Sequence, residues 1–335
     1  MTIRSIFCAG LTVGASLAFA EGGLYRVIDL SAGKDAKSYP VSYLDKVPEG
    51  GWGEEYKTTK LVMRRIDAGS FTMGSPTDEI GHNLSEVLHK VTISKSFYIG
   101  VFEVTQKQWE LVTGNSPSIH KYGLNQFFTG DDGQKKDAQP ARVSYGQHPV
   151  ECVSYEQMRG KNEGAKWPAS DGVDADSFIG KLRARTGLTD LDLPTEAQWE
   201  YACRAGTTTA FNNGMTLTND TIDASANLVA RNYHNTSDGK SADGSIKHAI
   251  VGSYLPNAWG LYDMHGNVFE MCLDRYGPYA KGDLTDPKGD AEGEYRVIRG
   301  GGWFDKFVRY CRAGFRHWVR IDERGWMYGF RLATR

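Results

Sequence analysis

The chain has 335 residues, 40% hydrophobic and 12% aromatic, so it can bury a large core, and its 39 glycines favour tight turns over long helices. Its 39 basic and 41 acidic residues leave a formal net charge of −2. Without a basic excess, the composition excludes the cationic surface that nucleic acid or an anionic membrane usually requires, and we predict no nucleic-acid partner.

The first twenty residues have the pattern of a secretory signal peptide. Arg4 supplies a positive charge, residues 6–17 are largely apolar, and residues 18–20 (AFA) fit the small-x-small pattern that precedes a cleavage site. We therefore predict a signal peptide, a mature chain that begins at Glu21, and export to the periplasm or the extracellular medium. An uncleaved anchor is the alternative, but the apolar run is short for a membrane span, and no later segment resembles one.

Export changes how the cysteines are interpreted, because disulfides persist in oxidising compartments. Cys8 would leave with the signal peptide, so the mature chain keeps Cys152, Cys203, Cys272 and Cys311. Four cysteines allow three full pairings, and none of these cysteines belongs to a C-x-x-C pair of the kind that suggests zinc. One or two disulfides and free buried thiols both stay open.

The segment 21–57 predicts short strands and turns, forming an N-terminal extension that is either an appended strand pair or a linker. A denser domain is predicted over 58–335. Within it, residues 60–75 (KLVMRRIDAGSFTMGS) alternate apolar and polar side chains and then turn at two glycines, which predicts a half-buried hairpin. The β character continues through residues 89–105.

Three short helices are predicted from one start signal, the capping box, in which a hydroxyl residue is followed three positions later by a glutamine. The pairs are Thr105 with Gln108, Ser154 with Gln157, and Thr195 with Gln198. The third helix is expected to stop at Gly206. Extended loops are predicted at about 114–148, 160–185 and 207–249, which gives an α+β chain of low regular secondary structure.

Seven sequence blocks then identify a family: GSFTMGS, FYIGVFEVTQKQWE, PVECVSYEQ, LPTEAQWEYACRAGT, NAWGLYDMHGNVFEM, RVIRGGGWFD and YGFRLA. In order and spacing they resemble the sulfatase-modifying-factor, or formylglycine-generating-enzyme, domain over residues 58–335. The resemblance implies one α+β domain with the complex fold of that enzyme, related in topology to C-type lectin-like folds and often holding calcium.

One of these blocks supports calcium through its own residues. In DMHGNVFE, two carboxylates flank a glycine turn that can aim backbone carbonyls, as a hard cation requires, although an acidic pair in a turn is more often a cap or a salt bridge. By resemblance, a first site would use Asp263, Glu270 and the carbonyls of Gly266 and Val268. A second site would use Asn227, Asp243 and the carbonyls of Leu228 and Ser245, with Asp238 as a competitor for Asp243.

The stretch RGGGWFDKFVRYCRAGFRHW, residues 299–318, covers the matching active-site region. Family members that make formylglycine oxidise a cysteine of a client sulfatase with oxygen, and the resemblance implies two cysteines five residues apart that hold copper(I). Here the second cysteine matches Cys311, or Tyr310 if the alignment has no gap. The first falls at Asp305 or Lys306, so one thiol of the copper pair is missing.

Cys311 is the candidate catalytic residue. If it lies on a strand, Arg309 shares its face and Arg312 points away, and arginines that face the thiol would lower its pKa and make it nucleophilic. The alternative is a packed or disulfide-bonded cysteine. The eight histidines show no metal-binding spacing, and the one grouping near the site is His317 with Asp305 and Cys311.

Two functions from different classes follow. The first is an exported oxidoreductase of the formylglycine-generating type, whose partner would be an exported sulfatase or another peptide client. The second is a non-catalytic, calcium-stabilised module that binds a peptide or a glycan. The missing thiol favours the second function, and the family resemblance favours the first.

Overall fold

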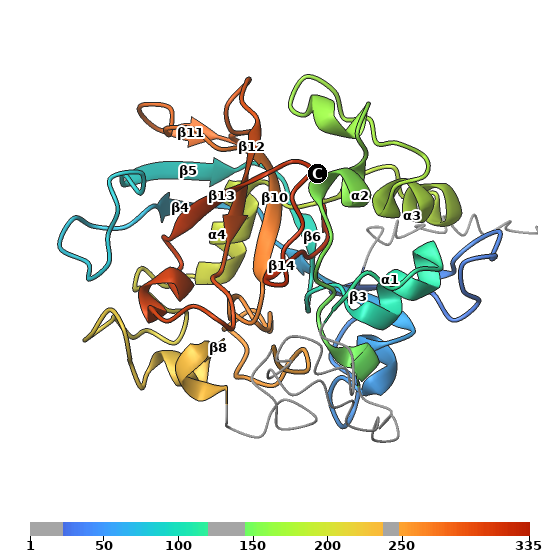
Figure 1. The fold of residues 1–335 in the computed structure, drawn as a ribbon, viewed down its shortest axis with the longest axis horizontal. Coiled ribbons are helices and arrows are strands. Elements are labelled where there is room, and N and C mark those ends of the chain that lie inside the picture. Colours follow the sequence, from blue (N-terminus) through green and yellow to red (C-terminus); the bar gives the residue numbers. More distant parts are fainter. Residues whose placement is uncertain (1–22, 120–144, 237–247) are drawn as a thin grey trace, which may run out of the picture.

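A computed structural model describes residues 23–119, 145–236 and 248–335 (Figure 1). The predicted signal peptide, and Asp238, Asp243 and Ser245 of the second predicted calcium site, lie outside the described residues. In the described part, no helix combines the length and the apolar character needed to cross a bilayer.

The largest sheet has six strands in the order β2-β1-β3-β6-β15-β7 and joins both ends of the described chain. β1 pairs antiparallel with both β2 and β3, and Val27 lies opposite Val62. The segment predicted as an N-terminal extension thus contributes two strands to this sheet. Its strands are β1 (Tyr25–Asp29), β2 (Val41–Leu44), β3 (Lys60–Ile66), β6 (Phe97–Gly100), β7 (Leu191–Asp192) and β15 (Ala333–Thr334).

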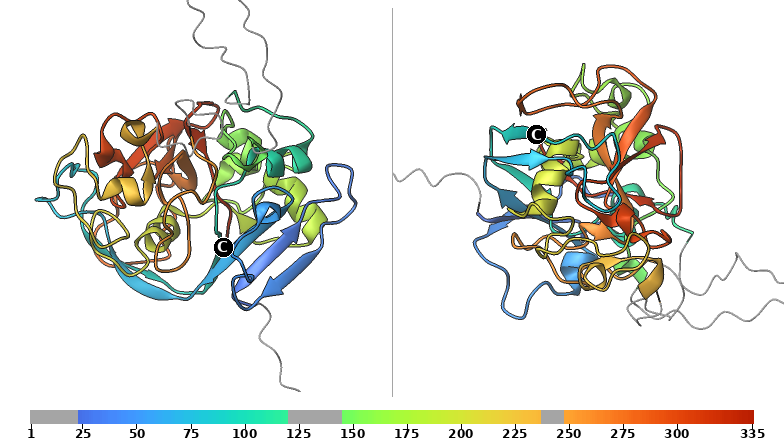
Figure 2. Two further views of the ribbon diagram at one scale, coloured as in Figure 1. Left: turned by 90° about the horizontal axis from the view of Figure 1, so that it is seen from below. Right: turned by 90° about the vertical axis from the view of Figure 1, so that its left-hand side faces the viewer.

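The described residues also form three smaller sheets. A four-stranded sheet, β13-β12-β10-β14, carries the C-terminal motifs, a three-stranded sheet is ordered β11-β5-β4, and β8 pairs with β9. Figure 2 shows the first strands of the largest sheet, in blue, on the opposite side of the molecule from the C-terminal sheet. The strands are β4 (Gly69–Met73), β5 (His89–Ile93), β8 (Ala230–Arg231), β9 (His265–Gly266), β10 (Phe269–Arg275), β11 (Leu284–Thr285), β12 (Tyr295–Arg299), β13 (Arg316–Arg320) and β14 (Tyr328–Gly329).

The hairpin predicted within residues 60–75 is wrong in its pairing. β3 and β4 both form, but β3 joins the six-stranded sheet while β4 pairs with β5, placing Phe71 opposite Val91. Alternation of apolar and polar residues marks a half-buried strand without naming its neighbour, so the strands could be predicted and their partner could not.

All three predicted capping boxes are confirmed. They open α1 (Gln106–Thr113), α2 (Tyr155–Arg159) and α4 (Glu196–Arg204), and α4 ends two residues before the predicted stop at Gly206. A further helix, α3 (Phe178–Thr186), lies in the segment 160–185, where a loop was predicted. Short 3-10 helices are η1 (Glu54–Lys57), η2 (Tyr145–Gln147), η3 (Gly164–Lys166), η4 (Ala226–Leu228), η5 (Tyr233–Asn235) and η6 (Val308–Cys311).

Aromatic packing joins the helices to the sheets. The ring of Trp109 on α1 stacks on Phe178 of α3 at 4.9 Å and meets Phe330 edge-on at 6.0 Å. A second core forms around the fully buried Trp199 of α4, whose indole N–H donates to the Glu270 carboxylate at 2.7 Å. These rings supply the large apolar contact area that a domain with short helices needs.

Loss of the cap on α4 should be measurable. The Thr195 hydroxyl accepts from the backbone N–H of Gln198 at 3.1 Å, and the Gln198 amide oxygen accepts from the N–H of Thr195 at 3.0 Å. We expect Thr195→Ala to lower the free energy of unfolding by about 1 kcal/mol in urea denaturation. Thr195→Ser keeps the hydroxyl and should retain most of the stability, so equal losses in both variants would contradict the capping role.

Candidate functional site

Cys311 lies at the end of η6 and not on a strand, which corrects the geometry expected for its flanking arginines. Its side chain is fully buried in a small apolar cluster with Phe211, Val229 and Val308. Close approach of the backbone needs the left-handed Gly301 (φ 76°), because a Cβ there would lie 2.9 Å from the sulfur of Cys311.

The Cys311 thiol is protonated in this environment. Burial raises the pKa of Cys311 well above its ordinary value, and the nearby Asp305 carboxylate raises it further. The expectation that neighbouring arginines lower this pKa is therefore wrong. Of the two alternatives for the cysteines, the structure supports free thiols, since Cys152, Cys203, Cys272 and Cys311 are all unpaired with one another.

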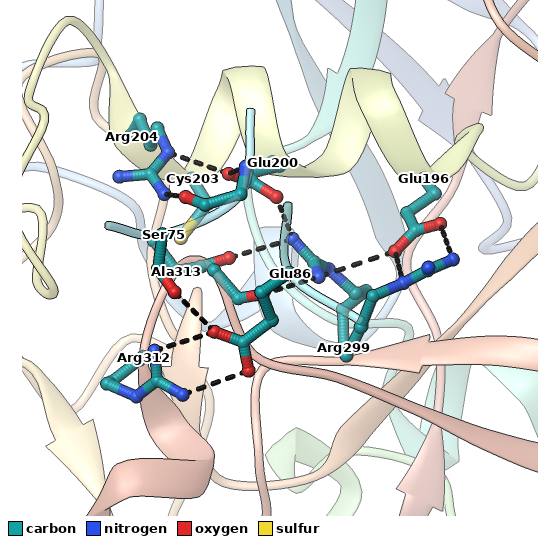
Figure 3. A network of polar contacts seen from close by, with 12 residues as sticks. Ser75, Glu86, Glu196, Glu200, Cys203, Arg204, Arg299, Arg312 and Ala313 are labelled. Atoms are coloured by element: carbon teal, nitrogen blue, oxygen red, sulfur yellow. Dashed lines mark hydrogen bonds and ion pairs between the residues drawn. The ribbon is translucent and has the colours of Figure 1, made fainter. Parts of the chain in front are cut away.

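The arginines that flank Cys311 form ion pairs with carboxylates, as Figure 3 shows for Arg312. Arg312 binds both carboxylate oxygens of Glu86, at 2.9 and 3.0 Å, and also contacts Glu79 at 2.6 Å. Arg309 does not pair with the thiol but with Asp220, at 2.7 Å. The positive charges of Arg309 and Arg312 are thus paired with carboxylates and do not stabilise a thiolate.

The network in Figure 3 holds the stretch 299–318 against α4. Arg299 bonds to the Glu200 carboxylate, lies 3.4 Å from Glu196, and donates to the carbonyl of Ala313 at 2.8 Å. Arg204 also bonds to Glu200, at 2.8 Å. Because these groups come from α4, β12 and the turn before β13, the network holds the stretch on both sides of Cys311.

A second arginine ties β13 to α4. Arg316 makes two hydrogen bonds to Glu196, at 2.8 and 2.7 Å, and its guanidinium lies 4.0 Å from the centre of the Tyr279 ring. The stretch that contains the candidate cysteine is therefore positioned by buried charge pairs in addition to apolar packing.

Asp305 and Lys306, the two positions at which the missing thiol falls in the sequence comparison, have different surroundings. The Asp305 carboxylate interacts electrostatically with Cys311, whereas Lys306 is exposed and offers its carbonyl to the ring of His234 at 2.8 Å. The Asp305 Oδ2 atom accepts the backbone N–H of Gly302 at 2.8 Å. Burial raises the pKa of Asp305 to about 7.

Phe304, the residue before Asp305, belongs to an aromatic cluster. The ring of Phe304 lies 5.2 Å from Trp303 and 4.7 Å from Trp326, and Trp303 and Trp326 are 5.1 Å apart. Phe304 is 38% exposed, so the cluster reaches the surface. The site therefore combines one carboxyl with large apolar rings.

His317 does not complete a metal site with Asp305 and Cys311. Its ring packs edge-on against Phe269 at 6.5 Å and Phe315 at 6.2 Å, and burial lowers its pKa. Across residues 23–119, 145–236 and 248–335, no group of three or more histidine, cysteine, aspartate or glutamate side chains is arranged to hold a metal ion.

His265 is a site residue that the sequence analysis missed. Its Nδ1 donates to the carbonyl of Cys311 at 2.7 Å, and its Nε2 accepts the backbone N–H of Asn212 at 3.1 Å. Burial lowers the pKa of His265 to about 4, so the ring is neutral and holds the end of η6 in place. The sequence block that contains His265 predicts only a calcium site, so it gives no indication of this role.

The structure describes the two carboxylates predicted for the first calcium site, and they differ in their hydrogen bonds. Asp263 is buried, adopts a left-handed conformation (φ 56°), and accepts the N–H of Gly252 through Oδ2 at 2.6 Å, while its Oδ1 has no hydrogen-bond partner. Glu270 is occupied instead: Arg331 donates to both of its oxygens, at 2.5 and 2.6 Å. Asp263 thus fits a cation ligand, whereas Glu270 would have to share its carboxylate with Arg331.

Glu103 is a third buried carboxyl beside Asp263 and Glu270, and no motif in the sequence points to it. It accepts the side-chain amide of Asn267 at 2.6 Å and the backbone N–H of Val268 at 3.2 Å. Burial raises its pKa well above the usual range, and Asp263 and Glu270 raise it further. Three carboxyls thus lie close together in the core, and burial and their mutual repulsion favour the protonated form of Glu103.

The second predicted calcium site can be described only on one side. Asn227 lies in η4 and accepts the side-chain amide of Asn232 at 2.9 Å, and the carbonyl of Leu228 accepts the N–H of Leu255 at 3.1 Å. Both described groups therefore already have a hydrogen-bond partner.

Residues 48–335 match the family model of the sulfatase-modifying factor enzyme 1-like domain. The chain belongs to this family. The formylglycine-generating enzyme of Bos taurus is 28% identical over 301 residues, which cover 84% of this chain and 76% of the relative. Another Bos taurus relative, named inactive C-alpha-formylglycine-generating enzyme 2, is 26% identical over 269 residues, covering 76% of this chain and 81% of the relative.

A solved structure agrees with this family assignment. Treponema denticola variable protein 1 matches with a TM-score of 0.59 and 27% identity, covering 83% of this chain and 96% of that protein. The predicted α+β class and the formylglycine-generating-enzyme-like fold are therefore correct. Sulfatase-modifying-factor proteins share this scaffold, and the side chains at the site must decide what this member does.

Proposed function

We propose that this formylglycine-generating-enzyme-like protein is a non-catalytic, calcium-stabilised binding module, in which the region of the copper site has become a ligand site. The observation that carries the proposal is the pair Asp305 and Cys311. A carboxyl takes the place of the first copper thiolate, and the remaining thiol is buried and protonated. The competing function, oxidation of a cysteine in an exported sulfatase or another peptide client, requires the thiolate pair.

The donor set does not fit copper(I). This ion is soft and binds thiolates, whereas a carboxylate is a hard ligand. Cys311 would also have to lose its proton against burial and the adjacent Asp305 charge. We therefore derive no reaction step through copper.

The relatives are compatible with this proposal. The family contains a protein named formylglycine-generating enzyme and another named as inactive, so membership does not by itself imply catalysis. We also propose that the fold is related in topology to C-type lectin-like folds. A surface of loops and aromatic rings suits peptide or glycan binding. The predicted signal peptide would place the module in the periplasm or outside the cell, and N-terminal sequencing of exported protein should then begin at Glu21.

Copper titration separates the two functions. We expect the mature protein not to compete with a chromogenic copper(I) chelator, because one thiolate is missing. Asp305→Cys should bind one copper(I) ion per chain, since it restores two sulfur ligands beside each other. Mass spectrometry of a cysteine-containing sulfatase peptide, incubated with oxygen, should show no aldehyde with the unaltered protein.

The control is Cys311→Ser in both backgrounds. Copper binding by Asp305→Cys should disappear when Cys311 is also replaced. If the unaltered protein binds copper(I) tightly and converts the peptide thiol to an aldehyde, and Cys311→Ser abolishes both, the binding-module proposal is overturned in favour of the oxidoreductase.

The proposal includes a bound calcium ion with Asp263 as one of its ligands. Its Oδ1 atom is buried without a hydrogen-bond partner, which costs free energy that a bound cation would offset. We propose that the carbonyls of Gly266 and Val268, with Glu270, complete the site. Glu103 would position the loop through its bonds to Asn267 and Val268. Asn227 and Asp243, with the carbonyls of Leu228 and Ser245, stay the proposed ligands of a second site.

A further inference from the structure

We propose that Asp305 anchors a binding site for an alkylammonium group, supplied either by a lysine side chain of a peptide or by a small free amine. This inference rests on the proposed binding function and names the chemistry of its ligand. It follows from the charge pairing among the described residues, the accessibility of the carboxylate and the aromatic cluster of the neighbouring Phe304.

Buried carboxylates elsewhere in the chain are commonly balanced by arginine. Direct ion pairs join Glu86 to Arg312, Asp192 to Arg159, Glu196 to Arg316, Glu200 to Arg204, and Glu270 to Arg331. Asp263 lacks a direct ion pair, and burial raises its pKa to about 6, but the positive charges of nearby Arg331 and Lys57 oppose that rise. Burying a carboxylate without a positive partner is costly, so this pairing is expected.

Asp305 departs from this pattern. Its one hydrogen bond is from the backbone N–H of Gly302, and within the described chain no lysine or arginine acts on its charge. The two basic residues nearest in sequence are directed elsewhere. Lys306 lies over the ring of Tyr233 at 5.7 Å, and Arg309 pairs with Asp220.

The carboxylate can be reached from outside. Asp305 is partly exposed, and its Oδ1 atom makes no hydrogen bond to described residues and is not among the fully buried polar atoms. A ligand can therefore supply the positive charge that the described residues do not.

The aromatic surroundings select the kind of cation. Phe304, next to Asp305, is exposed at the surface and is in ring contact with Trp303, Trp326 and Tyr233. Aromatic faces attract ammonium groups, and the apolar methylenes of an alkyl chain pack against the rings. A carboxylate that follows such an aromatic cluster in the chain is thus suited to an alkylammonium ligand more than to a hydrated metal ion.

Protonation of Asp305 should control the affinity. Its pKa of about 7 means that the carboxyl is neutral below that pH and charged above it, whereas an alkylammonium stays charged throughout. The titratable groups that interact with Asp305 are Cys311 on η6 and Tyr328 on β14, and their pKa values are both raised. Binding should therefore strengthen as the pH rises from 6 to 8.

Calorimetric titration of the mature protein tests the inference with three probes: butylammonium, the blocked tripeptide acetyl-Gly-Lys-Gly-amide, and the same tripeptide with its lysine side chain acetylated. We expect the charged tripeptide to bind and the acetylated one to bind at least about tenfold more weakly. Butylammonium binding as tightly as the tripeptide would assign the site to small amines, and tripeptide binding alone would assign it to peptides.

Asp305→Asn is the decisive variant, and Asp283→Asn is its matched control at an exposed carboxylate. We expect Asp305→Asn to weaken binding at least about tenfold and to remove its pH dependence, and Asp283→Asn to change neither. The inference is overturned if neither charged probe binds, if the neutral tripeptide binds equally, or if Asp305→Asn leaves affinity intact. Copper binding would instead overturn the proposed function.

Discussion

Arg299→Ala is expected to lower the free energy of unfolding by about 3–5 kcal/mol, the cost of breaking a buried ion pair from one side. Arg299 is fully buried, binds the Glu200 carboxylate, and lies 3.4 Å from Glu196. Its removal leaves both carboxylates short of positive charge and also frees the carbonyl of Ala313. Urea denaturation, followed by tryptophan fluorescence, measures the loss.

Two further variants separate charge from packing. Arg299→Lys keeps a positive charge but loses the forked geometry, so it should fall between the natural protein and Arg299→Ala. Adding Glu200→Gln to Arg299→Ala removes a buried carboxylate charge that has lost Arg299 as a partner. The double variant should therefore recover part of the lost free energy of unfolding. Arg320→Ala removes an exposed arginine with surface ion pairs and should barely shift the urea midpoint. An Arg299→Ala midpoint as close to the natural one as that of Arg320→Ala would contradict the role of the network.

Local features of the fold could be predicted from the sequence because their partners are near in the chain. Each capping box joins residues three positions apart, and all three formed as expected. α3 was missed although Ser177 caps it, because Gly180 in its first turn weakens the helical pattern. Gly180 is nevertheless required, since a Cβ there would lie 2.1 Å from the carbonyl oxygen of Asp174.

Long-range partners could not be predicted in the same way. The motif order placed Asp305 and Cys311 in one site, and the structure brings them together. The contacts of Arg312 with Glu86, and of Glu103 with Val268, join residues more than 150 positions apart. One sequence gives no signal for such pairs, so the arginines near Cys311 were assigned to the thiol although they belong to the carboxylates.

Calcium is expected to stabilise the mature protein by about 2.7 kcal/mol when its free concentration is 100 times the dissociation constant. The bound ion would contact the buried, unpartnered Oδ1 atom of Asp263 and balance part of the negative charge shared with Glu103 and Glu270. Differential scanning calorimetry should therefore show a higher unfolding temperature with calcium than after dialysis against EGTA.

The variants test whether Asp263 carries this effect. Asp263→Ala removes the ligand oxygen, so its unfolding temperature should respond little to calcium, whereas Asp283→Asn should respond like the natural protein. Glu103→Gln keeps the acceptor for the Val268 N–H but lowers the negative charge, so its calcium response should be reduced and not lost. If EGTA leaves the unfolding temperature of the natural protein unchanged, calcium does not bind at Asp263, and protonation of the buried carboxyls removes their negative charge instead. The raised pKa values of Asp263 and Glu103 would then describe the resting state of the core.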